Sequence, residues 1–447
     1  METTQQPRPS FFQSTTAKLM LVGILTLVLL IPLAFVQELI EERSQRQKEV
    51  VAETTQKWGS TVYFYGPILK VPYKTYVETV TVNEKTKVAT TNRTAAIQYA
   101  YVFPETLDNK SAVTTKVLKR SNYESVVFNA KMKFTGNYVK PDLSAKNISD
   151  ADILWDKATI LIKTTNLKSI RNEVKINFAG SPYTFQPIFS DTGSSEEALE
   201  TSFIDAAKLT SGANLTFEFD IAYDGSQQIM MVPIGKVTTA KMESNWASPS
   251  FTGNFLPGHS IKEMSDKGFV TDWKVLQINR PFTQQSFERL PNLRQYAFGV
   301  DFIIPANEYQ QNERAAKYGF LVIGLTFLIF FLIQTISKIN IHIFQYTMIG
   351  LALIMFYTLL ISITEHSSFL KAYLIAGTSV VAMITLYSYS VLKNRKFAVF
   401  TGISLSVLYT FIFVIIQLEN YALLFGSVGL FLILGAVMYM SRKIDWN

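Results

Sequence analysis

The chain has 447 residues, and its 42 Lys and Arg exceed its 35 Asp and Glu. It contains no cysteine, which excludes disulfide bonds, thiolate catalysis and thiolate metal sites. Part of the basic excess flanks long apolar runs, as in membrane proteins, so we expect no nucleic-acid partner.

The first predicted element is a membrane-spanning helix at residues 19–36, which follows a short cytoplasmic segment, residues 1–18. A bilayer core about 30 Å thick needs about 20 apolar helical residues. The run Leu19–Val36 is longer than a signal-peptide core of about 7–15 residues, and Ala34–Val36 is a poor cleavage site. We therefore expect an uncleaved anchor, bent near Pro32, and a helical stalk over residues 37–59.

Residues 60–317 contain no apolar run of spanning length, and we predict them to be β-rich. Apolar residues alternate with smaller or polar ones in Phe128–Phe134, Leu215–Tyr223 and Phe298–Ile304. A period of two is typical of strands with one buried face. Turn signals such as Gly66-Pro67 and Pro257-Gly258 separate these stretches. Many short strands of this kind favour an antiparallel β-sandwich.

A short internal echo predicts that this region is duplicated. Phe134–Tyr138, with the sequence Phe-Thr-Gly-Asn-Tyr, is repeated with one change at Phe251–Phe255. Ala-Lys-Met precedes both copies, and a Trp follows each, Trp155 and Trp273. Because a recurring motif at a domain-sized offset is typical of duplication, we predict two tandem β-sandwich-like repeats, residues 60–180 and 181–317.

Five further apolar runs predict a bundle of transmembrane helices over residues 318–440, before a tail at residues 441–447. The runs are Tyr318–Ile336, His342–Ile363, Phe369–Leu392, Phe397–Leu418 and Tyr421–Met440. With the first run, they make six predicted spans, one N-terminal and five C-terminal.

Basic residues at the ends of the spans predict the orientation. With both termini in the cytoplasm, the short outer loops hold no Lys or Arg, although Lys371 lies just inside the next span. The inner segments then carry Arg8, Lys18, Lys338, Lys393, Arg395, Lys396, Arg442 and Lys443. Because Lys and Arg accumulate on the cytoplasmic side, we predict an α-helical membrane protein with a large inserted extracytoplasmic β-rich domain.

Catalytic motifs for nucleotide binding, serine hydrolysis and zinc proteolysis are all missing from the sequence. His342 and His366 lie about 36 Å apart along one span and cannot share a metal. His259, beside a predicted turn, is most simply a surface residue. We therefore expect no cofactor and no metal, and we favour a non-enzymatic protein while leaving enzyme activity open.

Four ionisable residues form the one candidate site, in the short outer turns of the bundle: Glu365, His366, Lys371 and Glu419. Lys371 is a natural counter-ion for the two glutamates. One interpretation is an interfacial charge cluster that sets helix packing and depth. The other is a ligand-binding or proton-binding site, because ionisable groups within membrane segments are often functional.

Separate blocks of residues, in order along nearly the whole chain, resemble the bacterial CreD family of inner-membrane proteins. The blocks are Trp58-Gly59, Tyr65–Tyr73, Trp246–Pro257, Gly268-Phe269, Trp273, Phe298–Val300, Pro305–Tyr309, Arg314–Tyr318, Glu365-His366, Glu419–Leu424, Gly426-Ser427, Met438-Tyr439, Arg442 and Asp445-Trp446. The resemblance implies an inner-membrane protein with a large periplasmic domain that supports envelope integrity and the response to cell-wall-active antibiotics. It also implies a regulatory link to a two-component system, but no catalytic residues.

Three hypotheses for function follow from these observations. In the first, the β-rich domain binds an envelope protein or a lipid-linked precursor while the helices anchor it in the lipid bilayer. In the second, the chain is an outer-leaflet membrane enzyme or lipid transporter that uses Glu365, His366 and Glu419. In the third, it is a scaffold for another membrane protein.

Overall fold

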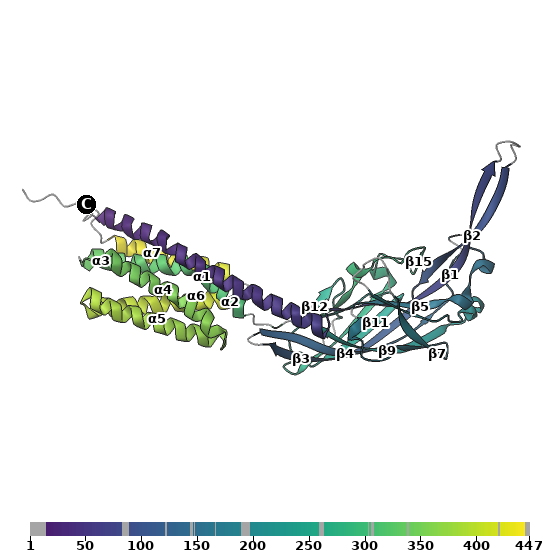
Figure 1. Cartoon of the computed structure of the whole chain (residues 1–447). Coiled ribbons are helices and arrows are strands. Elements are labelled where there is room, and N and C mark those ends of the chain that lie inside the picture. The colour runs from purple at the N-terminus through teal and green to yellow at the C-terminus, as the bar shows by residue number, and fades with distance from the viewer. Residues whose placement is uncertain are drawn as a thin grey trace, which may run out of the picture. The chain divides into compact units, whose positions relative to one another are not determined.

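A computed structural model of the chain describes residues 15–82, 89–120, 123–143, 146, 148–165, 167–188, 197–258, 263–302, 304, 308–337, 339–418 and 421–442. The chain divides into two compact units (Figure 1). The helical unit comprises Met1–Glu49 and Ala306–Asn447, and the β unit comprises Val50–Pro305.

Six helices in the described residues are long and apolar enough to cross a membrane, as predicted. The first, α1, spans Thr15–Trp58 and continues through Pro32 without a break, so the predicted span and stalk are one helix. The others are α3 (Gly319–Ser337), α4 (Ile343–Thr364), α5 (Phe369–Leu392), α6 (Arg395–Gln417) and α7 (Ala422–Ser441). A shorter helix, α2 (Glu308–Lys317), precedes α3.

Helix α1 packs on the bundle where glycines allow a close approach. A Cβ atom on Gly350 of α4 would lie 2.2 Å from Leu29 of α1, and one on Gly319 of α3 would lie 2.8 Å from Leu33. Both leucines are buried. Because lipid offers no hydrophobic driving force between helices, small residues that admit a neighbour stabilise such contacts through van der Waals packing.

Polar contacts tie α1 to the bundle near both ends of α4. The ammonium of Lys18 donates to Oδ1 of Asn340, just before α4, over 2.7 Å. Near the other end, Arg43 of α1 lies 3.6 Å from Glu365, just after α4. The 22 residues of α4 correspond to about 33 Å of helix, which matches a bilayer core. Helix α1 therefore runs parallel to α4.

The β unit is a single connected sheet of 16 strands. The strands are β1 (Val62–Val82), β2 (Ala89–Val102), β3 (Thr106–Arg120), β4 (Tyr123–Tyr138), β5 (Thr159–Thr164), β6 (Lys175–Phe178), β7 (Ser181–Ile188), β8 (Glu197–Thr201), β9 (Leu215–Ser226), β10 (Gln228–Met231), β11 (Val237–Ser244), β12 (Pro249–Gly253), β13 (Glu263–Ser265), β14 (Gly268–Leu276), β15 (Gln285–Phe287) and β16 (Phe298–Phe302). Their order is β12-β16-β10-β1-β5-β8-β7-β6-β9-β4-β3-β11-β14-β13, and β2 joins β1 to β15.

The sheet folds over one aromatic core. Phe64 of β1 and Phe134 of β4 are far apart in strand order, yet their rings stack 4.3 Å apart. Phe134 in turn stacks on Phe219 of β9 at 4.9 Å. All three rings are buried. This two-layer packing agrees with the predicted sandwich and with the buried faces expected for Phe134 and Phe219. Each buried aromatic ring removes a large apolar surface from water.

Two separately packed tandem repeats, 60–180 and 181–317, are not seen. Strands β1 and β3 of the first segment pair in parallel with β10 and β11 of the second, and β4 pairs with β9. The expected boundary at Gly180 lies in the turn of the β6–β7 hairpin. Most strand pairs are antiparallel, as predicted, but these two parallel pairs join the halves.

The echoed motifs occupy places that do not correspond. Ala130–Met132 and Phe134–Tyr138 lie on the same strand, β4. Their counterparts lie on β11 and at β12, which do not pair with each other. Trp155 begins a 3-10 turn, whereas Trp273 lies within β14. The short sequence repeat is therefore not accompanied by a repeated substructure.

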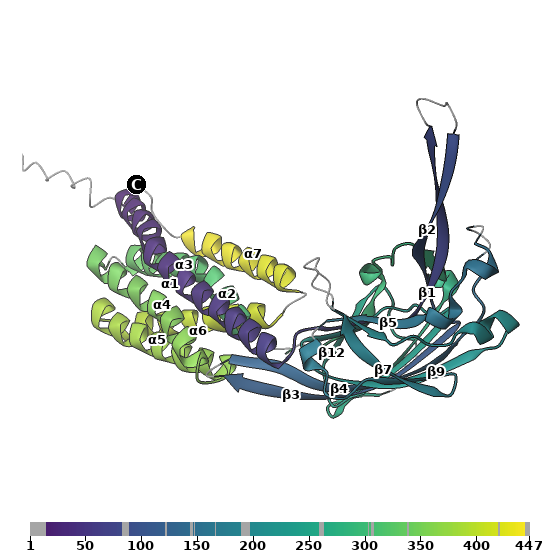
Figure 2. The ribbon, with the colours of Figure 1, turned by 45° about the vertical axis from the view of Figure 1, so that its right-hand side comes forward.

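The outer parts of β1 and β2 form a two-stranded arm that projects from the β unit (Figure 2). Beyond Tyr73, where an isolated bridge reaches Ile153, β1 pairs with β2 alone. The base of the arm is held by the Tyr76 hydroxyl, which donates to Asp152 over 2.9 Å.

A buried arginine between β14 and β15 links its own segment to the β10–β11 connection. Arg280 is 4% exposed, and its guanidinium donates to the carbonyls of Phe282, Ile234 and Gly235 over 3.1–3.2 Å and to the amide oxygen of Gln284. Burial lowers the pKa of Arg280 to about 10, so it remains charged at neutral pH. Because a buried charge needs hydrogen-bond partners, these carbonyls and the arginine depend on each other.

Replacing Arg280 tests how much it contributes to the stability of the β unit. We expect Arg280→Ala to lower the free energy of unfolding by about 3 kcal/mol, because it leaves buried carbonyls without donors. Thermal unfolding of the detergent-solubilised chain measures the effect. Arg289→Ala, at an exposed arginine of the same unit, is the matched control and should change little. Equal stability of both variants would contradict the assigned role.

Candidate functional site

Glu365, the main carboxylate of the predicted cluster, caps the end of α4 and pairs with a residue of α1. Its Oε1 lies 3.6 Å from Nε of Arg43. The Glu365 side chain is 21% exposed, and that of Arg43 is 46% exposed. Lys371 is exposed and makes no ion pair with Glu365 among the described contacts, so the counter-ion of Glu365 is Arg43. Arg43 was missed because it lies 322 residues earlier in the sequence, within a run of charged residues.

The other predicted site residues contribute less to this geometry. His366 is exposed in the α4–α5 turn, where its backbone N–H donates to Ile363. Glu419 lies outside the described residues, as does His259. His342 is the N-cap of α4, where its Nδ1 accepts from the Phe344 N–H, and it therefore has a structural role. No group of three potential metal-ligating side chains occurs in the part of the chain that the structure describes.

Helix α2 lies against the same helices and completes this end of the helical unit. Its buried face comprises Tyr309, Asn312, Ala315 and Ala316, and it contacts α3, α4, α5 and α6. The amide of Gln37 on α1 donates to the Ala316 carbonyl over 2.9 Å. The Arg43–Glu365 pair therefore belongs to a set of contacts that hold α1 and α2 on the bundle.

Buried tyrosines lie inside the bundle, on α4, α5 and α6. The rings of Tyr373 and Tyr409 lie 5.2 Å and 4.7 Å from Phe356, and the Tyr373 hydroxyl donates to the Tyr409 carbonyl over 2.8 Å. The hydroxyls of Tyr357 and Tyr409 are buried without a hydrogen-bond partner among the described residues. Sequence patterns place these tyrosines in spans but do not indicate that they meet.

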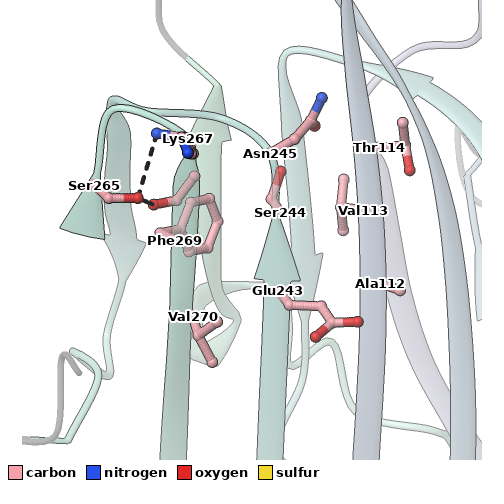
Figure 3. A pocket seen from close by; sticks show the side chains of 11 residues that line it. Ala112, Val113, Thr114, Glu243, Ser244, Asn245, Ser265, Lys267, Phe269 and Val270 are labelled. Atoms are coloured by element: carbon pink, nitrogen blue, oxygen red, sulfur yellow. Dashed lines mark hydrogen bonds between the residues drawn. The ribbon is translucent and has the colours of Figure 1, made fainter. Parts of the chain in front are cut away.

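The β unit has a depression of about 380 Å³ where β11 ends beside β3 (Figure 3). Asn245 closes β11 there, because its carboxamide accepts from the Thr115 N–H over 2.7 Å and donates to the Thr115 carbonyl over 3.2 Å. Figure 3 shows Glu243 directed toward β3, near Ala112, and Ser265 bonded to the backbone of its own hairpin. The depression is open, and its central amide is already satisfied.

A larger hollow, about 550 Å³, lies where the β2–β3 connection meets the segment after β4 and the start of β15. Its lining includes Phe103, Glu105, Lys140, Gln277 and Phe287. This volume falls within the range of about 300–1,000 Å³ typical of small-molecule sites. No motif pointed to it, because its walls come from three distant parts of the sequence.

These features define a multi-pass membrane protein with a large β unit inserted between its first and second membrane helices. The family model described as "Inner membrane protein CreD" matches residues 14–447. The Inner membrane protein CreD of Escherichia coli strain K12 is 27% identical over 427 residues, which cover 94% of this chain and 91% of that protein. The chain therefore belongs to the CreD family and is a multi-pass inner-membrane protein.

The ion pair at the end of α4 can be tested by a double-mutant cycle. We expect Arg43→Ala and Glu365→Gln each to lower thermal stability in detergent by only about 0.5 kcal/mol, because both groups are partly exposed and screened. The double variant should lose no more than either single variant.

Lys371→Ala is the matched control for Arg43→Ala, since it removes the same charge near the same turn. Non-additive effects between Lys371 and Glu365, combined with additive effects between Arg43 and Glu365, would contradict the assigned pairing.

Proposed function

We propose that the β unit lies in the periplasm and binds a component of the cell envelope, while the helical unit anchors it in the inner membrane with both termini in the cytoplasm. In this way the protein supports envelope integrity, including the response to cell-wall-active antibiotics. Membership of the CreD family supports a membrane protein with a role in the envelope.

One observation carries the proposal. Of the residues described between α1 and α2, none belongs to a helix that could cross a membrane, and they form a unit with its own core. Such a unit, inserted between spans, must lie wholly on one side of the bilayer. The excess of Lys and Arg on the opposite ends of the spans favours the periplasmic side.

The geometry at Glu365 gives little support to the alternative of an outer-leaflet enzyme or lipid transporter. The carboxylate is engaged by Arg43, and the described residues contain no group of three potential metal-ligating side chains. An ion pair between a span and the turn that follows α4 suits the interpretation of an interfacial charge cluster that sets packing and depth.

Removal of the β unit tests the proposal directly. We expect a chain in which residues 60–304 are replaced by a flexible linker to reach the membrane but to fail completely in restoring antibiotic resistance to a deletion strain. Growth inhibition and immunoblotting of membranes measure the two properties. If the shortened chain fully restored resistance at normal abundance, the proposal would be wrong.

Orientation can be read with single cysteines, because the natural chain has none. We expect a membrane-impermeant maleimide to label Lys267→Cys in the β unit and Ser367→Cys in the α4–α5 turn when it is added to spheroplasts. Arg442→Cys, after α7, should be labelled only once the membrane is permeabilised. The reverse pattern would place the β unit in the cytoplasm.

A further inference from the structure

The larger hollow of the β unit has a wall that is held rigid before any ligand arrives. Gln284, which contributes to its lining, accepts from buried Arg280 and donates to the carbonyls of Pro104 and Ile234 over 2.6 Å and 3.2 Å. Its own backbone carbonyl accepts from the Phe103 N–H over 2.9 Å. In this network the carboxamide of Gln284 both accepts and donates, and such bonding fixes a side chain that lines a site.

Charges around the hollow are largely balanced by partners on the protein. Glu105 pairs with Lys236 at 2.7 Å, and Lys140 pairs with Asp150 at 3.6 Å. Neither pair leaves an uncompensated charge that would select a strongly anionic or cationic ligand. The hollow therefore differs from a phosphate site, in which clustered cations or a helix N-terminus face the ligand.

Apart from Asp142, the rest of the lining consists of neutral polar groups and apolar surfaces. Gln277 is exposed, and its amide has no hydrogen-bond partner among the described residues, so it can both donate and accept. Gln285 already spans the opening, because its amide donates to the Asp142 carbonyl. Phe287 is half-buried and packs edge-on against Tyr73, with ring centroids 6.3 Å apart.

We propose that this hollow binds a glycan, an uncharged sugar chain of the cell envelope, with Gln277 and Phe287 as recognition residues. Sugar hydroxyls and amides both donate and accept hydrogen bonds, which matches the free amide of Gln277. The apolar face of a sugar ring packs on aromatic and aliphatic side chains, which Phe287 supplies. The proposal rests on the function above, since it names the envelope component that the β unit binds.

Calorimetric titration of the full-length chain in detergent with a soluble β-1,4-linked N-acetylglucosamine tetramer tests the site. We expect binding, and we expect Gln277→Ala and Phe287→Leu each to weaken Kd about tenfold, the loss that follows from one important contact. Gln186→Ala, at an exposed glutamine on β7 away from the hollow, is the matched control and should bind like the natural chain. Unchanged thermal unfolding of Phe287→Leu shows that the fold is kept.

Three outcomes would overturn the inference: no binding of the tetramer, equal Kd values for all variants, or binding of a short cationic or anionic peptide at this hollow in its place. Complementation separates this inference from the proposed function. If the chain without residues 60–304 fails but Gln277→Ala and Phe287→Leu restore resistance fully, the proposed function stands and the glycan site is wrong. If the shortened chain restores resistance, the proposed function itself is wrong.

Discussion

Inside a bilayer every backbone N–H and C=O must find its hydrogen bond within the chain, because lipid offers none. This constraint turns the apolar runs into helices and keeps the polar stretch between α1 and α2 out of the membrane. Helix α1 must also pack against spans of which the first, α3, begins 261 residues after α1 ends (Trp58 to Gly319). Two kinds of contact hold α1 in place. Leu29 and Leu33 pack against two glycines of the bundle, and Lys18 and Arg43 make polar contacts near the two ends of α4.

The β unit must be stabilised by packing and strand pairing alone, because it has no disulfide to restrict its unfolded state. Its stability comes from one shared core and from strands exchanged between its two halves. Stacked Phe64, Phe134 and Phe219 join the layers, and the parallel pairs β1–β10 and β3–β11 join the halves. Neither half could keep this core without the other, so the unit is expected to unfold as a whole.

The same interleaving forms the larger hollow of the β unit, which is the proposed ligand site. Loops from the β2–β3 connection, the end of β4 and the start of β15 meet because distant strands are neighbours in the sheet. Arg280 stabilises these loops by donating hydrogen bonds to the backbone carbonyls of Ile234, Gly235 and Phe282. In the helical unit, by contrast, the charged residues at the end of α4 serve the packing of α1 and α2. The proposed glycan site and the membrane anchor thus lie in different units.

The amino-acid sequence by itself determined the six spans, the continuation of α1 past its apolar run and the β-rich character of the inserted region. These depend on local hydrophobicity and on side-chain periodicity, which are written into short windows. Tertiary structure alone decided that Glu365 pairs with Arg43 and not with nearby Lys371. It also decided that residues 60–304 form one interleaved sheet in place of two repeats, and that Gln277 and Phe287 line one hollow. These features depend on contacts between residues far apart in the chain, which no local pattern encodes.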